Sequence, residues 1–169
     1  MSISDKVLNA LNSQVGIEFS ASLKYDSIGS YFAAESLPRL AAFYYQQSTE
    51  ERMHAHRIIK YILDVGGRVR IPAIGETPWN FKTAEAAVKT ALDSEAAVTK
   101  SINSLMDLAQ KEKDHATANM LLWFVTEQVE EIAQAEQMLR IMQRAGEEGL
   151  LLVEEYISQM PEGGGKRRD

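Results

Sequence analysis

The sequence of 169 residues contains no cysteine, which excludes disulfides, a thiolate zinc site and a thiol nucleophile. Any bound metal must therefore be held by oxygen atoms and imidazole nitrogens. Proline is scarce, with four residues, and this scarcity favours a mainly helical chain. Long apolar runs are also missing. No stretch approaches eighteen consecutive apolar residues, so no membrane span is expected.

The chain also lacks a strong positive charge and a leader-like N-terminus. Residues 1–14 contain no basic region followed by an apolar run, so we expect no signal peptide and a cytoplasmic location. The net charge of −6 argues against nucleic acid as a partner. The length suits one domain, which we place at residues 1–160, followed by a flexible basic tail at residues 161–169.

Helical periodicity is the main pattern that the sequence does contain. Apolar and small side chains recur at steps of three and four over four long segments, which predicts amphipathic helices. The predicted helices cover about residues 4–34, 36–65, 83–113 and 114–145, with a short fifth helix at about 149–160. Residues suited to cap the long helices are Ser4 or Asp5, Ser36, Thr83 and Asp114.

Residues 66–82 break this pattern, because they contain glycine and proline and show no helical period. A connection of this length between neighbouring helices is unusual. We therefore expect it to cross the length of the molecule. Trp79 and Phe81 are expected to anchor it to the protein surface.

Polar side chains interrupt the apolar stripe of each long helix near its middle. They are Glu18, Glu51 with His54, Glu95, and Gln128 with Glu131. A buried carboxylate destabilises a fold strongly unless it is paired or bound to a metal. The same interruption on four helices is best explained by one shared ligand. Di-iron carboxylate bundles use this design, with a Glu from two helices and Glu-x-x-His from the other two.

The predicted ligand set is asymmetric. Glu51 and His54 are three residues apart, so they lie on one face of their helix. The fourth helix carries Gln128 and Glu131 at the equivalent positions, which leaves a single nitrogen ligand and two unequal metal positions. Oxygen-rich groups with one imidazole suit Fe(II), and Mn(II) or Zn(II) are able to compete.

These motifs resemble those of a non-haem ferritin of the bacterial or archaeal kind, over roughly residues 4–160. The resemblance is carried by Glu18 with Tyr25 seven residues later, Glu-Glu-x-x-His-Ala at 50–55, Glu95, and Glu-Gln-Val-Glu-Glu at 127–131. It implies an all-α fold: a ferritin-like four-helix bundle with a long crossover between helices two and three and a short fifth helix.

The resemblance also implies a role for each polar residue. Glu18, Glu51 and His54 would hold a first iron. Glu51 would bridge to a second iron, which Glu95 and Glu131 would also bind. Gln128 would be a hydrogen-bonding neighbour of that second position.

Four further residues match the family pattern around the di-iron centre. Glu50, Glu127 and Glu130 match a third iron position that faces the cavity in prokaryotic ferritins. Tyr25 matches a tyrosine that is a candidate one-electron donor. From the residues alone, Tyr25 also fits a core tyrosine bound to a carboxylate, and the three glutamates also fit a solvated charged face.

As a member of this family, the chain would be a ferroxidase that oxidises Fe(II) with dioxygen or peroxide. It would store ferric mineral inside a homo-oligomeric cage of 24 subunits. Haem is not expected, because bacterioferritins ligate haem through a methionine directly after the bridging glutamate. Here Arg52 follows Glu51, and Met53 comes one residue late.

Three other functions are open but less well matched. A rubrerythrin-like peroxide-reducing enzyme would carry Glu-x-x-His twice and often a cysteine-bound iron, whereas this chain has one such motif and no cysteine. A cage that stores iron without oxidising it would lack most of the ligands. A DNA-protecting mini-ferritin would lack the fifth helix at this end of the chain.

Overall fold

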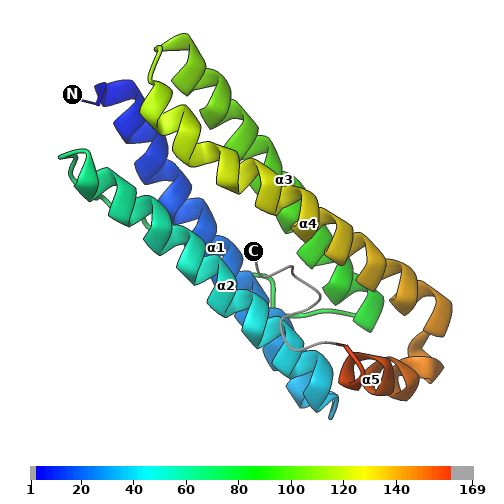
Figure 1. Cartoon of the computed structure of the whole chain (residues 1–169). Helices are drawn as coiled ribbons and strands as arrows, with labels where there is room; N and C mark the ends of the chain where they lie inside the picture. The colour runs from blue at the N-terminus through cyan, green and yellow to red at the C-terminus, as the bar shows by residue number, and fades with distance from the viewer. Residues whose placement is uncertain (1–2, 161–169) are drawn as a thin grey trace.

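The computed structural model describes residues 3–160, and the predicted tail at 161–169 lies outside them. Four long helices form an antiparallel bundle, and a short helix packs across one end (Figure 1). The helices are α1 (Asp5–Ala34), α2 (Pro38–Asp64), α3 (Ala84–Lys111), α4 (His115–Ala145) and α5 (Leu150–Ser158), with a 3-10 turn at Glu147–Gly149. The predicted all-α bundle with a crossover and a fifth helix is confirmed.

Three of the predicted caps are confirmed. The Ser4, Thr83 and Asp114 side chains accept hydrogen bonds from backbone N–H groups in the first turns of α1, α3 and α4. The prediction that Ser36 caps α2 is wrong. Ser36 has a positive φ of 61° and ends α1 instead: its N–H donates to the Ala33 carbonyl, and the Leu37 N–H donates to that of Phe32.

Carboxylates from the C-terminal segment bind two helix N-termini. The Glu154 side chain on α5 accepts hydrogen bonds from the backbone N–H groups of Arg39 at 3.0 Å and Leu40 at 2.7 Å. The Glu147 side chain accepts one from the Ala84 N–H at 2.9 Å. A carboxylate at a helix N-terminus accepts hydrogen bonds from the unpaired backbone N–H groups, and its negative charge is attracted to the positive end of the helix dipole. Glu154 thus supplies the cap that α2 lacks in its own sequence.

The connection between α2 and α3 runs along the bundle from one end to the other, as predicted (Figure 1). The Asn12 side chain holds it to α1, because it donates to the Arg68 carbonyl at 3.0 Å and accepts from the Arg70 N–H at 2.7 Å. Gly16 permits the close approach of this segment: a Cβ at that position would lie 2.2 Å from the Pro72 Cγ.

The two aromatic residues of this connection behave differently. Phe81 packs edge-on against Tyr31 with ring centroids 5.5 Å apart, so its predicted anchoring role is confirmed. Trp79 is 67% exposed, so the same prediction for Trp79 is wrong. The backbone provides the attachment there, since the Ser27 hydroxyl donates to the Pro78 carbonyl.

Two apolar clusters form the core. The polar residues of α2, α3 and α4 lie between these clusters in sequence, and Glu18 of α1 lies between Val15 and Ala21 of the second cluster. One cluster contains Tyr25 to Tyr44 of α1 and α2 with residues 84–91 of α3 and Met138 and Met142 of α4. The other contains residues 7–21, Ile58 and Ile62, residues 98–109, and Leu121 with Phe124. Within residues 3–160, no helix has the length and apolarity that a membrane span requires.

We expect Glu154→Ala to lower the free energy of unfolding by about 1–2 kcal/mol, because two backbone donors at the α2 N-terminus lose their acceptor. Urea denaturation followed by circular dichroism measures the change. Glu155→Ala is the matched control, since Glu155 is the exposed neighbour on the same helix. Equal effects of the two substitutions would contradict the capping role.

Candidate metal centre

The six residues on the interrupted stripes lie in the bundle interior, at the level between the two apolar clusters. Their relative exposures are 0% for Glu18, 1% for Glu51, 4% for His54, 0% for Glu95, 3% for Gln128 and 1% for Glu131. Helical periodicity places them inward, because each follows the apolar stripe of its own helix. The bundle therefore buries four carboxylates from four different helices in one polar layer.

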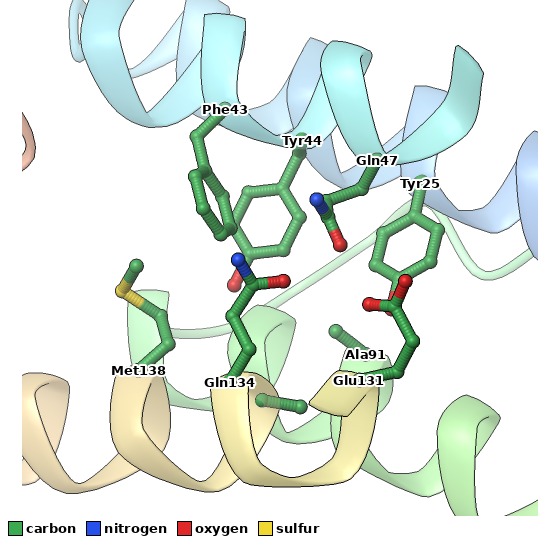
Figure 2. Close-up of a pocket in the computed structure, with 9 residues that line it drawn as sticks. Tyr25, Phe43, Tyr44, Gln47, Ala91, Glu131, Gln134 and Met138 are labelled. Atoms are coloured by element: carbon green, nitrogen blue, oxygen red, sulfur yellow. The ribbon is translucent and has the colours of Figure 1, made fainter. Parts of the chain in front are cut away.

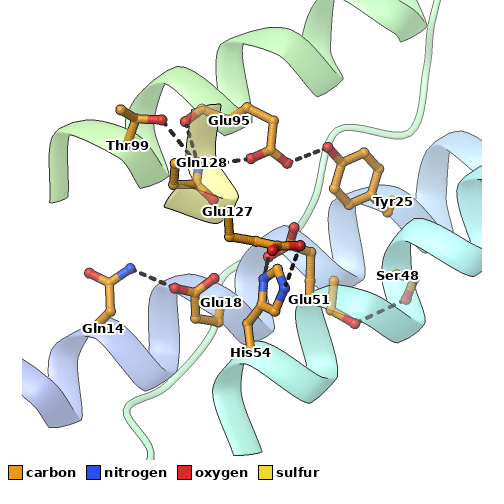
Figure 3. Close-up of polar contacts among 11 residues, drawn as sticks. Gln14, Glu18, Tyr25, Ser48, Glu51, His54, Glu95, Thr99, Glu127 and Gln128 are labelled. Atoms are coloured by element: carbon orange, nitrogen blue, oxygen red, sulfur yellow. Dashed lines mark hydrogen bonds and ion pairs between the residues drawn. The ribbon is translucent and has the colours of Figure 1, made fainter. Parts of the chain in front are cut away.

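One group of candidate metal ligands joins α1 and α2. Glu18, Glu51 and His54 each offer a ligand atom, and these atoms lie within 4.8 Å of one another. His54 Nδ1 lies 3.2 Å from Glu51 Oε2, as expected for residues one helical turn apart (Figure 3). All three side chains are buried, and the predicted first metal position is assembled from these residues without any further helix.

A second group joins α2 and α4 through the same histidine. His54, Glu127 and Glu131 offer ligand atoms that also lie within 4.8 Å of one another. His54 Nε2 faces Glu127 Oε1 at 4.0 Å (Figure 3). The sequence suggested Glu127 for a third, outer position, whereas the structure places it directly beside His54. No local signal separates these two placements, because they depend on how α4 faces α2.

Glu95, predicted for the second metal position, makes two hydrogen bonds and belongs to neither group. Its Oε1 accepts a short hydrogen bond from the Tyr25 hydroxyl, and its Oε2 accepts one from Gln128 Nε2 at 3.1 Å (Figure 3). Gln128 Nε2 also lies 3.1 Å from the Thr99 hydroxyl. Gln128 is thus a hydrogen-bonding neighbour of Glu95, and its place beside a second metal position stays a prediction.

The two remaining glutamates of the predicted third position lie farther out. Glu50 is half-buried and accepts a hydrogen bond from Gln46 Nε2 at 3.3 Å. Glu130 is exposed on α4. Neither residue joins the two ligand groups that the structure forms among residues 3–160.

Burial and neighbouring charges control the protonation of Glu18. Burial raises the pKa of the Glu18 carboxyl well above its ordinary value of 4.5, and the nearby Glu51 carboxylate raises it further. A hydrogen bond from Gln14 and the proximity of His54 act in the opposite direction on this pKa. Glu18 Oε2 is buried without a hydrogen-bond partner. A buried carboxylate oxygen of this kind, facing a second carboxylate, fits a bound cation.

Tyr25 lies among these carboxylates and is fully buried in the bundle. Burial raises the pKa of its hydroxyl well above 10.0, and the charges of Glu95, Glu51 and Glu131 raise it further. The phenol therefore stays protonated and donates its hydrogen bond to Glu95.

The sequence matches known proteins of one family. Residues 8–145 match the family described as the ferritin-like domain. The chain belongs to the ferritin family. It is 38% identical over 149 residues to ferritin BfrB of Mycolicibacterium smegmatis, a match that covers 88% of this chain and 82% of the relative. It is 34% identical over 157 residues to a bacterial non-haem ferritin of Bacteroides fragilis, covering 93% of this chain and 99% of the relative.

Solved structures show the same fold. The model superposes on an open-pore ferritin from the archaeon Archaeoglobus fulgidus with a TM-score of 0.91 and 36% sequence identity. This alignment covers 95% of this ferritin-family chain and 100% of the archaeal chain. The resemblance predicted from the motifs is therefore confirmed at the level of family and fold.

The sequence interpretation missed several polar neighbours of the site. Gln14 is 1% exposed and donates to Glu18 Oε1 at 2.8 Å (Figure 3). Its position four residues before Glu18 is a signal for contact along one helix face. Gln47 is buried and lines a cavity of about 10 Å³ with Glu131, enough for about one water molecule (Figure 2). Gln47 lies on the stripe one turn before Glu51, which is also a recognisable signal.

Aromatic side chains cover the histidine of the site. The Trp123 and His54 rings lie edge to face with centroids 5.4 Å apart, and Phe124 contacts the same imidazole at 6.0 Å. The Arg57 guanidinium lies 4.0 Å from the Trp123 ring centroid, a cation–π contact. These contacts restrict the His54 ring and separate it from solvent.

We expect Glu18→Gln to stabilise the metal-free protein by about 1–3 kcal/mol at pH values above the raised pKa of Glu18, because it removes a buried charge there. With a folded-state pKa above the ordinary 4.5, the folded state binds more protons than the unfolded state. Stability from Glu18 is therefore present below pH 4.5 and lost as pH rises through the elevated pKa. The advantage of Glu18→Gln should grow over that interval in thermal denaturation with a chelator present.

With Zn(II) present, the parent should become more stable to heat than Glu18→Gln. A metal that binds only the folded state stabilises it, and the parent keeps the Glu18 ligand that the variant lacks. Glu136→Gln, at an exposed position of α4, is the control for a change of charge alone. A variant as stable as the parent at every pH, with the same response to Zn(II), would contradict this account of the site.

Proposed function

We propose that this ferritin-family chain is an iron-storage ferritin with ferroxidase activity, contained in a single domain at residues 1–160. It binds Fe(II) as substrate between its four long helices and oxidises it with dioxygen or peroxide. One observation supports this function above the others: two groups of ligand atoms, buried except for the half-buried Glu127, meet at His54 and draw on α1, α2 and α4. Adjacent positions of this kind suit the simultaneous binding of two ions.

The chemistry of the donor atoms supports iron as the substrate. Carboxylate oxygens with one imidazole nitrogen suit Fe(II). The buried negative charges also attract Fe(III) more strongly than Fe(II), since Coulomb attraction grows with the charge of the ion. The site therefore lowers the free energy of the oxidised product relative to the substrate. Two Fe(II) ions lose one electron each, and the oxidant accepts both.

Each residue has a defined role in this proposal. Glu18, Glu51 and His54 hold the first Fe(II), and Glu51 bridges to the second, which Glu95 and Glu131 also bind. Each Glu95 oxygen has two lone pairs, so it is able to keep its hydrogen bond and still bind an ion.

Four further residues surround the two iron positions in the proposal. Gln128 orients Glu95 through its amide hydrogen bond. Glu127, which lies 4.0 Å from His54 Nε2, would hold a third iron together with Glu50 and Glu130.

Tyr25 is proposed as a one-electron donor to the oxidation. Its hydroxyl already donates a hydrogen bond to Glu95 Oε1. When the phenol gives a third electron to the oxidant, its proton moves along this bond to the carboxylate, so no isolated charge forms on the phenol in the bundle interior. Burial is the main cause of the raised pKa of Tyr25, and the three carboxylates that a phenolate would face raise this pKa further.

A cage of 24 copies is proposed for storage of the ferric product, without haem. Leu151 and Leu152 on α5 are each 75% exposed, and a neighbouring subunit would cover them. Arg52 occupies the position after Glu51, and Met53 is 58% exposed. The homologous archaeal protein is described as an open-pore ferritin. The proposal therefore specifies the number of subunits in the cage and not the form of its pores.

Aerobic addition of Fe(II) should produce ferric absorbance faster than buffer alone. Glu51→Ala should slow the initial rate by about tenfold or more, because it removes the residue shared by both proposed iron positions. Glu136→Ala, an exposed glutamate of α4, is the matched control and should keep the parent rate.

Two outcomes would overturn the enzyme proposal. Stoichiometric Fe(II) binding without faster oxidation would leave only storage. Undiminished oxidation by Glu51→Ala would place the reaction elsewhere.

Multi-angle light scattering should give a particle mass 24 times the chain mass of 18.9 kDa. Leu151→Glu with Leu152→Glu should lower this mass by placing charges in the proposed contact. Leu63→Glu is the comparison variant, because Leu63 is also exposed and lies at the C-terminal end of α2, away from α5. A dimer or a 12-mer from the parent chain would contradict the proposed cage.

A further inference from the structure

A buried hydrogen-bonded chain leads from α3 to the candidate ligand on α1. The Ser101 hydroxyl on α3 donates to Gln14 Oε1 on α1. Gln14 Nε2 in turn donates to Glu18 Oε1 at 2.8 Å. Gln14 is 1% exposed, and Ser101 is half-buried. None of the functions described above uses Gln14 or Ser101.

The chemistry of an amide gives this chain a direction. A glutamine side chain has a donor end and an acceptor end, whereas an ionised carboxylate only accepts hydrogen bonds. Rotating the Gln14 amide by half a turn would place its oxygen against Glu18 and cause repulsion. With the donor end on Glu18, the acceptor end faces Ser101, whose hydroxyl satisfies it.

The consequence is that the two oxygens of Glu18 differ. Oε1 is held by the Gln14 amide, while Oε2 is buried and has no hydrogen-bond partner. Oε1 already uses one lone pair on the Gln14 amide, so Oε2 is the oxygen with both lone pairs available to an ion beside Glu51 and His54. The bond from Gln14 also restrains rotation of the carboxylate about its terminal torsion.

We propose that Gln14, braced by Ser101, is a positioning residue that makes Glu18 a one-oxygen ligand of the ion shared with Glu51 and His54. A two-oxygen Glu18 would occupy one more coordination position of that ion. Gln14 therefore keeps a position available for the oxidant, as catalytic metal sites require. This inference rests on the proposed function for the identity of the ion, although its test needs no oxidation.

The test compares substitutions of two buried amide side chains on α1, Gln14 and Asn12. Gln14→Met removes the donor at nearly constant volume. Asn12→Leu removes a buried amide of α1 that binds the crossover segment and not the metal site. Co(II) serves as the probe under anaerobic conditions, because its d–d absorption reports coordination number. Glu18→Gln identifies which part of the spectrum depends on Glu18.

Gln14→Met should change the Co(II) spectrum toward a higher coordination number, since Glu18 becomes free to bind through both oxygens. It should also raise the Co(II) dissociation constant by about tenfold, the usual effect of losing a hydrogen bond to a ligand. Asn12→Leu should lower thermal stability but keep the parent spectrum. A parent-like spectrum from folded Gln14→Met would overturn the proposal.

Ser101 gives a second test on a different helix, which decides the question if Gln14→Met does not fold. Ser101→Ala should shift the Co(II) spectrum in the same direction as Gln14→Met, by a smaller amount. Ser101→Thr should keep the parent spectrum, because threonine retains the hydroxyl. Identical spectra for alanine, threonine and parent would overturn the bracing role. A parent that binds no Co(II) in a Glu18-dependent way would also overturn it. Absence of Fe(II) oxidation, by contrast, affects only the proposed enzyme.

Discussion

The burial of several carboxylates in one layer of the bundle is the constraint on which the rest of this structure depends. Glu18, Glu51, Glu95 and Glu131 are each at most 1% exposed, and each would destabilise the fold if left charged and uncompensated. Two apolar clusters on either side of this layer provide the packing that offsets the penalty. The molecule therefore combines an ordinary helical core with a buried layer of carboxyl groups that protons or cations would neutralise.

Hydrogen bonds from neighbouring side chains, within one helix or between helices, set the surroundings of each carboxylate. Glu95 has both oxygens engaged, by Tyr25 from α1 and Gln128 from α4. Glu18 has one oxygen engaged by Gln14 and one without a hydrogen-bond partner. The two residues look equivalent as single glutamates on apolar stripes, yet their surroundings differ. Such differences would give the two proposed metal positions different affinities.

Much of the fold follows from local pattern. The α3 and α4 caps at Thr83 and Asp114 were predictable because a cap acts within three residues of its own helix. The Ser36 prediction failed because Ser36 lies both after the end of α1 and before the start of α2, and its backbone forms the C-terminal turn of α1. The α2 N-terminus is capped by Glu154, more than one hundred residues away in sequence. No local signal indicates a partner at that distance.

The sequence alone determined which residues would be buried at the level of the site, because helical periodicity sets the face of each side chain and helix length sets its height. It also determined the family, through motifs on four helices. Only the tertiary structure decided which groups meet: Glu127 beside His54, Glu95 with Tyr25, and Ser101 behind Gln14. These contacts depend on how the helices rotate against one another, and that rotation is set by packing across the whole bundle rather than by any single segment.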